Sequence, residues 1–310
     1  MSSPLAFING KWVQPSELTI PIYDAGFVLG ATVTEQLRTF RGRLFRLTAH
    51  LDRLMHSLHI IQVDPGYSAG ELADIATEVI RHNHPLVAEG DDLGLGMWVT
   101  PGSYPAFAGG VESGPTVCVH SYPLPFGLWA NKYRDGERVV VSDVVQVAPR
   151  TWPPELKCRS RMHYFLADRR AQAAESGARA ILLDGEGHVC EAATANVVMF
   201  RARDGLISPR HSAILPGISL MTLAELADGL GIPYQQRAIR PAELAAADEL
   251  FLTSTSVCVL PVVRCDGQAV GAGVPGRIFR RLLAAWSELV GVEIESQAVR
   301  CAARRGGDAT

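Results

Sequence analysis

The chain has 310 residues, which is long enough to bury a sizeable core and to form one large or two medium domains. Its 47% apolar and 20% charged residues are typical of a globular protein and exclude a disordered or fibrous chain. The formal net charge of −3 gives no general reason to expect nucleic acid or an anionic membrane as a partner.

Targeting and metal signals are also missing from the sequence. No apolar run approaches the ~18 residues of a membrane-spanning helix, and the N-terminal MSSPLAFING lacks a charged region followed by an apolar one. We therefore expect a cytoplasmic protein. The six cysteines include no C-x-x-C pair, so we predict neither a disulfide framework nor a metal site.

The first 122 residues predict a small α/β domain. Two short apolar runs joined at Asn9-Gly10 indicate a hairpin over 6–13. A strand over 33–40 turns at Arg41-Gly42 into a second strand over 44–47. The remaining elements are a helix with its N-cap at Thr48, a helix over 68–82, and strands over 93–100 and 117–122.

The first long strand carries an unusual polar face. Side-chain alternation places Thr34, Gln36 and Arg38 on one face of this strand. A polar face on a central strand needs partners, so we expect the strand to line a cleft. In the helix that follows, His50 and Arg53 are neighbours three residues apart, and taken alone they are most simply a surface pair.

The stretch 123–135, PLPFGLWANKYRD, interrupts the strand pattern and is predicted to link two domains. The larger second domain then spans 136–296, and the tail over 297–310 is expected to be disordered. Strand pairs interrupted by helices favour an α+β fold over a simple parallel sheet. The predicted helices are 161–176, 218–229, 241–246 and 276–290, and the predicted strands are 138–145, 178–183, 188–190, 196–201, 205–208, 234–239, 249–254 and 258–264.

Lysine is scarce in this chain, since the 29 basic residues include only Lys11, Lys132 and Lys157. A primary amine can form a Schiff base, whereas a guanidinium cannot. Pro153 and Pro154 fix an extended approach to Lys157, just before a predicted helix. Arg159 and Arg161 flank it, and their charge would lower the pKa of its amine. The alternative interpretation is a solvated basic loop.

Three later stretches carry groups that complement an amine. Glu191 ends a strand and is followed by small residues. The segment 215–219, LPGIS, opens a helix whose free N–H groups favour an anion. The segment 253–256, TSTS, follows a strand and offers hydroxyl and amide donors. Taken singly, these are a salt-bridged glutamate, an ordinary helix start and a polar turn.

Together these groups match the needs of pyridoxal phosphate. A lysine holds its aldehyde, a carboxylate keeps its pyridine nitrogen protonated, and donor-rich turns hold its phosphate. A dinucleotide or mononucleotide site is disfavoured, because neither G-x-G-x-x-G nor G-x-x-x-x-G-K-[ST] occurs in the chain.

Ordered motifs along nearly the whole chain resemble the class IV, or fold-type IV, pyridoxal-phosphate enzymes. These motifs are FINGKWV, DAGFVLG, HLDRL, ELK, ARAILLDGEGHVCEAATANVVMF, ILPGIS, DELFLTSTSVCVLPV and DGQAVGAG. The family includes branched-chain and D-amino-acid aminotransferases, R-selective amine transaminases and 4-amino-4-deoxychorismate lyase. The resemblance implies a two-domain α+β fold of the D-amino-acid aminotransferase type with the cofactor between the domains. It also implies a homodimer with the site near the subunit interface and a loop, here 123–131, over it.

Carried over residue by residue, the resemblance makes Lys157 the Schiff-base lysine and Glu191 the partner of the pyridine nitrogen. Leu215 would pack against one face of the ring. Tyr164, matched through a one-residue insertion after Lys157, would bond the phenolic oxygen of the cofactor, and Met162 or His163 are alternatives for that space. The residues expected at the phosphate are Arg53, Ile218, Ser219 and Thr255.

The implied activity is a ping-pong transfer of an amino group between an amino acid or primary amine and a 2-keto acid. The alternatives are a lyase of the 4-amino-4-deoxychorismate type and a non-catalytic dimeric relative. This sequence differs from the family at two positions that contact the substrate in its members. Pro101 replaces an arginine that clamps the carboxylate, and Thr34 replaces the aromatic residue before Glu35. The candidate substrate contacts, of which we expect at least one arginine to set the preference, are Thr34, Gln36, Arg38, Arg159, Arg161 and Ser256.

Overall fold

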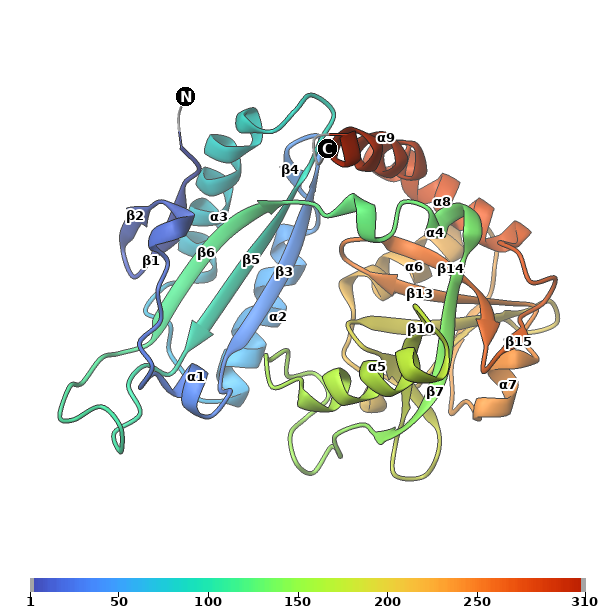
Figure 1. Cartoon of the computed structure of the whole chain (residues 1–310), viewed down its shortest axis with the longest axis horizontal. Coiled ribbons are helices and arrows are strands. Elements are labelled where there is room, and N and C mark those ends of the chain that lie inside the picture. The colour runs from blue at the N-terminus through green and yellow to red at the C-terminus, as the bar shows by residue number, and fades with distance from the viewer. Residues whose placement is uncertain (1–2, 308–310) are drawn as a thin grey trace. The chain divides into compact units, whose positions relative to one another are not determined.

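The computed structural model describes residues 3–307, which form two compact units (Figure 1). The first unit comprises the residues up to Leu124 together with Leu156–Ser160, and the second comprises Pro125–Glu155 and the residues from Arg161 onward. This division differs from the expected one, in which a linker over 123–135 separated two continuous domains. Most of that stretch belongs to the second unit, and the short segment that carries Lys157 returns to the first.

The first unit contains a sheet in the order β2-β1-β6-β5-β3-β4, in which every pair is antiparallel. Its strands are β1 (Ala6–Ile8), β2 (Lys11–Val13), β3 (Val33–Phe40), β4 (Arg43–Leu44), β5 (Leu93–Thr100) and β6 (Thr116–Pro123). Its helices are α1 (Ala25–Val28), α2 (Leu47–Ile60) and α3 (Ala69–Asn83), with short 3-10 turns at Pro15–Glu17 and His84–Leu86.

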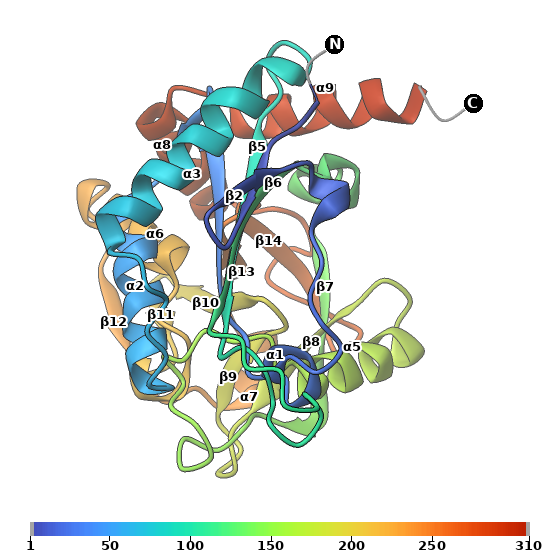
Figure 2. The same ribbon diagram turned by 90° about the vertical axis from the view of Figure 1, so that its left-hand side faces the viewer.

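Helices α2 and α3 cover one face of this sheet (Figure 2). Apolar side chains of both helices, including Leu54 and Leu72, pack against Val33 and Leu37 of β3. Thr34, Gln36 and Arg38 alternate with these residues along β3, so they lie on the face away from the helices. Helix α2 begins at Leu47, directly after the left-handed backbone of Arg46 (φ 53°), and the expected N-cap at Thr48 is therefore wrong.

The second unit contains a mixed sheet in which β9 pairs with both β8 and β10. The strands β10, β13, β14, β7, β8 and β9 consequently form a closed ring, with β11 and β12 extending it from β10 and β15 pairing with β14. The strands are β7 (Glu137–Val145), β8 (Arg179–Leu183), β9 (Val189–Ala192), β10 (Ala195–Arg201), β11 (Gly205–Ser208), β12 (Tyr234–Gln236), β13 (Glu249–Ser254), β14 (Cys258–Cys265) and β15 (Gln268–Ala269).

The helices of the second unit lie around this ring. They are α4 (Lys132–Asp135), α5 (Met162–Ala174), α6 (Ile218–Gly229), α7 (Pro241–Ala245), α8 (Arg277–Val290) and α9 (Ile294–Gly307), with 3-10 turns at Phe126–Leu128 and His211–Ala213. Mixed parallel and antiparallel pairing agrees with the expected α+β class. Between residues 3 and 307, no helix combines the length and apolar character that a membrane crossing requires.

Helix α9 occupies most of the region expected to be a disordered tail, so that expectation is wrong for the residues up to Gly307. Residues 308–310 lie outside the described residues. Ile294, Ala298 and Cys301 recur at helical spacing and are at most 1% exposed. They face the rest of the second unit, where α9 contacts the 3-10 turn Phe126–Leu128 (Figure 1). Burial of this apolar stripe stabilises a helix here, although the arginines near the end of the chain are typical of a disordered tail.

Replacement of Ala298 tests whether α9 is packed. Ala298→Asp places an unpaired carboxylate in a site that is 0% exposed, so the free energy of unfolding should fall by about 3 kcal/mol. The control is Ala303→Asp in the same helix, because Ala303 is exposed. Thermal and chemical denaturation of both variants measure the difference. Equal stability of the two variants would show that α9 does not pack against the unit.

Candidate active site

Lys157 lies in an extended segment that runs beside β3 in the first unit. The Thr34 amide donates to the Lys157 carbonyl at 3.0 Å, and the Arg159 amide donates to the Thr32 carbonyl at 2.8 Å. The Lys157 amide also donates to Ser57 Oγ of α2 at 3.2 Å. The half-buried lysine is therefore held at the edge of a sheet, a few residues before α5, and its role as the Schiff-base lysine stays a prediction.

Arg53 and His50 of α2 both contact the carboxylate of Glu35 on β3. Arg53 donates through Nε at 2.9 Å and through Nη2 at 2.8 Å, and His50 Nδ1 lies 3.2 Å from Oε1. Glu35 is 0% exposed and His50 1%, so the interpretation of His50 and Arg53 as a surface pair is wrong. Because they are spaced i, i+3, both side chains project from the same side of α2 and reach Glu35 on the helix side of the sheet.

The electrostatics of this cluster favour a charged Glu35 and a neutral His50. Burial alone would raise the pKa of Glu35, but the Arg53 charge and the His50 contact lower it far below its ordinary range. Burial lowers the pKa of His50, and the smaller effect of Glu35 does not reverse this. The Lys157 charge also lowers both pKa values. Glu35 and Arg53 therefore form the charged pair.

The carboxylate of Glu191 in the second unit accepts hydrogen bonds at both oxygens. Tyr164 Oη donates to Oε1 at 2.7 Å and Gln146 Nε2 at 2.8 Å, while Gln146 Nε2 also lies 3.0 Å from Tyr164 Oη. On Oε2, Asn196 Nδ2 donates at 3.4 Å and the Leu215 amide at 3.3 Å. Burial, followed by the Glu191 charge, raises the pKa of Tyr164 well above its ordinary value, so the phenol stays protonated as a donor.

The first turn of α6 lies next to this carboxylate. Its N-cap, Gly217, has no side chain, and an added Cβ would collide with the amide oxygen of Asn196. Asn196 in turn donates to the Leu215 carbonyl at 2.9 Å. Ile218 and Ser219, which begin the helix, are buried. A helix start without a capping side chain offers its N–H groups to an anion.

The turn between β13 and β14 carries Thr255 and Ser256 and extends from the same end of β10. Thr253 of β13 pairs directly with Asn196, and the turn follows it. Thr253 itself donates to the Cys258 carbonyl at 2.6 Å, which ties the two ends of the turn together. The second unit therefore brings a bonded carboxylate, an uncapped helix start and a hydroxyl-bearing turn to one end of its sheet.

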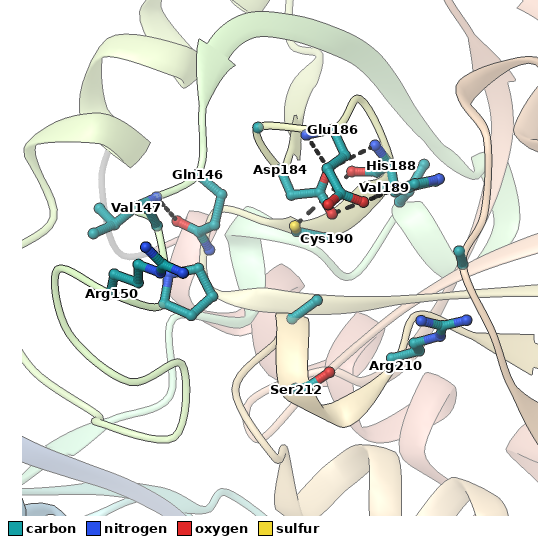
Figure 3. Close-up of a pocket in the computed structure, with 15 residues that line it drawn as sticks. Gln146, Val147, Arg150, Asp184, Glu186, His188, Val189, Cys190, Arg210 and Ser212 are labelled. Atoms are coloured by element: carbon teal, nitrogen blue, oxygen red, sulfur yellow. Dashed lines mark hydrogen bonds and ion pairs between the residues drawn. The ribbon is translucent and has the colours of Figure 1, made fainter.

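A cavity of about 470 Å³ adjoins this group within the second unit (Figure 3). Its walls are the segment 146–150, the β8–β9 hairpin over 184–190, and residues after β11. Gln146 is the link, because it lines the cavity and also bonds Glu191. Within the hairpin that forms one wall of the cavity, His188 Nδ1 lies 3.6 Å from Asp184 Oδ2. None of the residues predicted to bind the cofactor lines this cavity.

The remaining candidate residues are distributed over both units. Thr34 donates from Oγ1 to the Met97 carbonyl at 3.0 Å, and the Arg38 guanidinium lies 4.0 Å above the Phe40 ring. Both therefore have structural contacts on the polar face of β3. Arg161 is the N-cap of α5 in the second unit.

The alternatives to Tyr164 stand at the start of α5. Met162 is 69% exposed, and the ring centroids of His163 and Tyr164 are 4.0 Å apart. The Tyr164 hydroxyl donates to Glu191, whereas the sequence analysis expected it at the phenolic oxygen of the cofactor. Its role toward a cofactor therefore stays a prediction.

Sequence reasoning missed Gln146 and did not assign Asn196 within its motif. Gln146 directly follows the last residue of β7, and a polar residue at a strand end was the available signal. His120 and Tyr122 of β6 were also missed. They lie on the polar face of the first sheet, opposite two glycines of β5. The alternating glycines of the LGLG segment in β5, which leave room for large side chains on the neighbouring strand, were the available sequence signal.

Comparison with known proteins gave consistent matches along the chain. A family model, Amino-transferase class IV, matches residues 32–265. The D-alanine aminotransferase of Bacillus licheniformis is 30% identical over 88% of this chain and 93% of its own length. The branched-chain-amino-acid aminotransferase of Salmonella typhimurium is 28% identical over 94% of both chains. A solved branched-chain amino acid aminotransferase of T.th. with pyridoxamine 5′-phosphate is 24% identical and superposes with a TM-score of 0.82 over 94% of this chain and 95% of its own.

Glu35→Gln tests the buried ion pair of the first unit. The change removes the carboxylate that binds the buried Arg53 guanidinium, so the free energy of unfolding should fall by about 3 kcal/mol at neutral pH. Because the pKa of Glu35 is lower in the folded chain, its contribution is complete above its ordinary pKa and is lost as the pH falls below that value. The stability difference between wild type and variant should therefore shrink from about pH 5 to about pH 3.

The matched control for this experiment is Glu78→Gln, which removes an exposed partner of Arg81 on α3. Urea denaturation across the pH series measures all three proteins. The free energy of unfolding of the control should equal that of the wild type at every pH. A Glu35→Gln protein as stable as the control at neutral pH would contradict the buried pair.

Tyr164→Phe tests the support of Glu191. The variant loses a hydrogen bond to a buried carboxylate, so the free energy of unfolding should fall by about 1.5–3 kcal/mol. The control is Tyr104→Phe, since the Tyr104 hydroxyl makes no hydrogen bond within residues 3–307. Denaturation midpoints compare the two proteins. Equal midpoints would rule out a stabilising bond between Tyr164 and Glu191.

Proposed function

The chain belongs to the class IV aminotransferase family, and on that premise we propose that it transfers an amino group between an amino acid or primary amine and a 2-keto acid, with pyridoxal phosphate as cofactor. The resemblance indicated by the motifs is confirmed, as is the α+β fold. No comparison favours a lyase. The relatives are named as aminotransferases, which supports the reaction class. Their names give different amino acids as substrates, so family membership alone does not identify the donor and the acceptor.

The observation that carries this proposal is the arrangement around Glu191. A buried carboxylate supported by Tyr164 and Gln146 stands next to the uncapped first turn of α6. A carboxylate fits a protonated ring nitrogen, and a helix start fits a phosphate. The residues present therefore fit pyridoxal phosphate. When bound, this cofactor supplies a carbonyl that condenses with amines and a ring that withdraws electrons.

Each residue then has a defined task in the proposed reaction. The Lys157 amine would hold the cofactor at its carbonyl carbon and, when free, would move a proton at the substrate α-carbon. Glu191 holds the proton on the pyridine nitrogen, and its donors keep it oriented for that purpose. Leu215, whose amide bonds Glu191, orients the ring. The proposed phosphate ligands are Arg53, Ile218, Ser219 and Thr255.

Two further parts of the proposal concern Tyr164 and assembly. The bond from Tyr164 to Glu191 supports an action through that carboxylate, in addition to the expected contact with the phenolic oxygen of the cofactor.

Family membership supports a homodimer. Localisation in the cytoplasm stays a prediction.

Absorbance spectra of the purified protein test the proposal. Wild-type protein reconstituted with pyridoxal phosphate should show a visible band that shifts to the near ultraviolet when a productive amino donor is added without an acceptor. The donor panel contains D- and L-amino acids and both enantiomers of 1-phenylethylamine. Lys157→Ala should lose the donor-induced shift, because no amine remains to move the proton.

The control is Lys11→Ala, which removes an exposed lysine and should behave as the wild type. Release of pyruvate from 4-amino-4-deoxychorismate without any amino acceptor would instead indicate the lyase. A wild-type spectrum that responds to no donor would contradict the aminotransferase and favour the non-catalytic relative.

A further inference from the structure

The face of the first sheet away from α2 and α3 carries a row of polar side chains. In the strand register, Gln36 of β3 is opposite Gly96 of β5, and Gly96 is opposite His120 of β6. The next row places Gly94 opposite Tyr122. Residues that are directly opposite each other project from the same face, so Gln36, His120 and Tyr122 share it.

The two glycines of β5 let the rings of β6 lie across the sheet. A Cβ added at Gly96 would meet the His120 imidazole at 2.7 Å, and one added at Gly94 would collide with the Tyr122 ring. The two ring centroids are 6.1 Å apart. The Gln36 amide donates to the Tyr122 hydroxyl, which fixes the hydroxyl and leaves its own proton to be donated to another group.

The segment that carries Lys157 adds a cation to this cluster. It runs extended beside β3 with Cys158 opposite the helix-facing Val33. The neighbouring side chains of Lys157 and Arg159 therefore project to the opposite face, which Gln36 and His120 share. Burial lowers the pKa of His120, and the Arg159 charge lowers it further. Burial raises the pKa of Tyr122, and the Arg159 charge opposes that rise. The Arg159 guanidinium therefore acts on both rings.

We infer that Arg159, His120, Tyr122 and Gln36 form a subsite for the carboxylate of the substrate, which makes a carboxylate-bearing amino acid, rather than a plain amine, the preferred donor. This inference rests on the proposed aminotransferase function. Hydrogen bonds to an ionised carboxylate are charge-assisted and strong, and a guanidinium can bind both of its oxygens while a hydroxyl adds a further donor. The subsite also accounts for Pro101, because an arginine clamp is not needed there when Arg159 supplies the cation.

Steady-state kinetics of the holoenzyme with matched donors test the subsite. Alanine and ethylamine, or 2-phenylglycine and benzylamine, differ only in the carboxylate, and both enantiomers of each amino acid are used. Arg159→Leu should raise the KM for the amino acid at least about tenfold and leave that for the amine nearly unchanged. Tyr122→Phe should act in the same direction, and Arg159→Lys should recover part of the loss.

The control variant is Arg43→Leu, which removes an exposed arginine from β4 of the same unit and should change neither KM. The inference is overturned if Arg159→Leu alters the two KM values equally or alters neither. Calorimetric binding of 3-phenylpropionate, a carboxylate that cannot be transaminated, separates this inference from the proposed function. Binding weakened by Arg159→Leu supports the subsite even if no donor reacts, and binding unaffected by it overturns the subsite even if transamination occurs.

Discussion

A buried carboxylate is costly unless donors surround it, and the candidate residues of each unit include such a group. In the first unit Glu35 binds Arg53, so a strand and a helix are joined by a charged pair on the packed face of the sheet. In the second unit Glu191 binds Tyr164 and Gln146 at one oxygen. These donors come from α5 and the end of β7, so the position of the carboxylate depends on how the closed ring of strands packs.

The chemistry that we propose follows from the difference between these two groups. Glu35 is bound by the charged side chain of Arg53, whereas the Tyr164 hydroxyl and the Gln146 amide bind Glu191 and hold its carboxylate in place. The adjacent start of α6 adds the positive end of a helix dipole. We propose that these groups of the second unit bind both ends of a phosphorylated pyridine and that Lys157 supplies the amine.

Local patterns predicted what depends on local structure. The helix over 218–229 was predicted with its observed bounds, because a Pro-Gly start and regular apolar spacing define it within a few residues. Glu191 and Lys157 were singled out because their residue types are chemically distinctive, and their roles stay predictions. The burial of His50 was not predictable, since its partner Glu35 is distant in sequence and i, i+3 spacing fits a surface as well as a core. The return of 156–160 to the first unit likewise depends on backbone bonds to β3.

The central claim is that Lys157 is the residue that binds the cofactor. Borohydride reduction of the holoenzyme, followed by mass mapping of its peptides, tests this directly, because the chain has only three lysines. The account predicts that the phosphopyridoxyl group is found on the peptide that carries Lys157. A label on Lys11 or Lys132, or on no lysine at all, would contradict it.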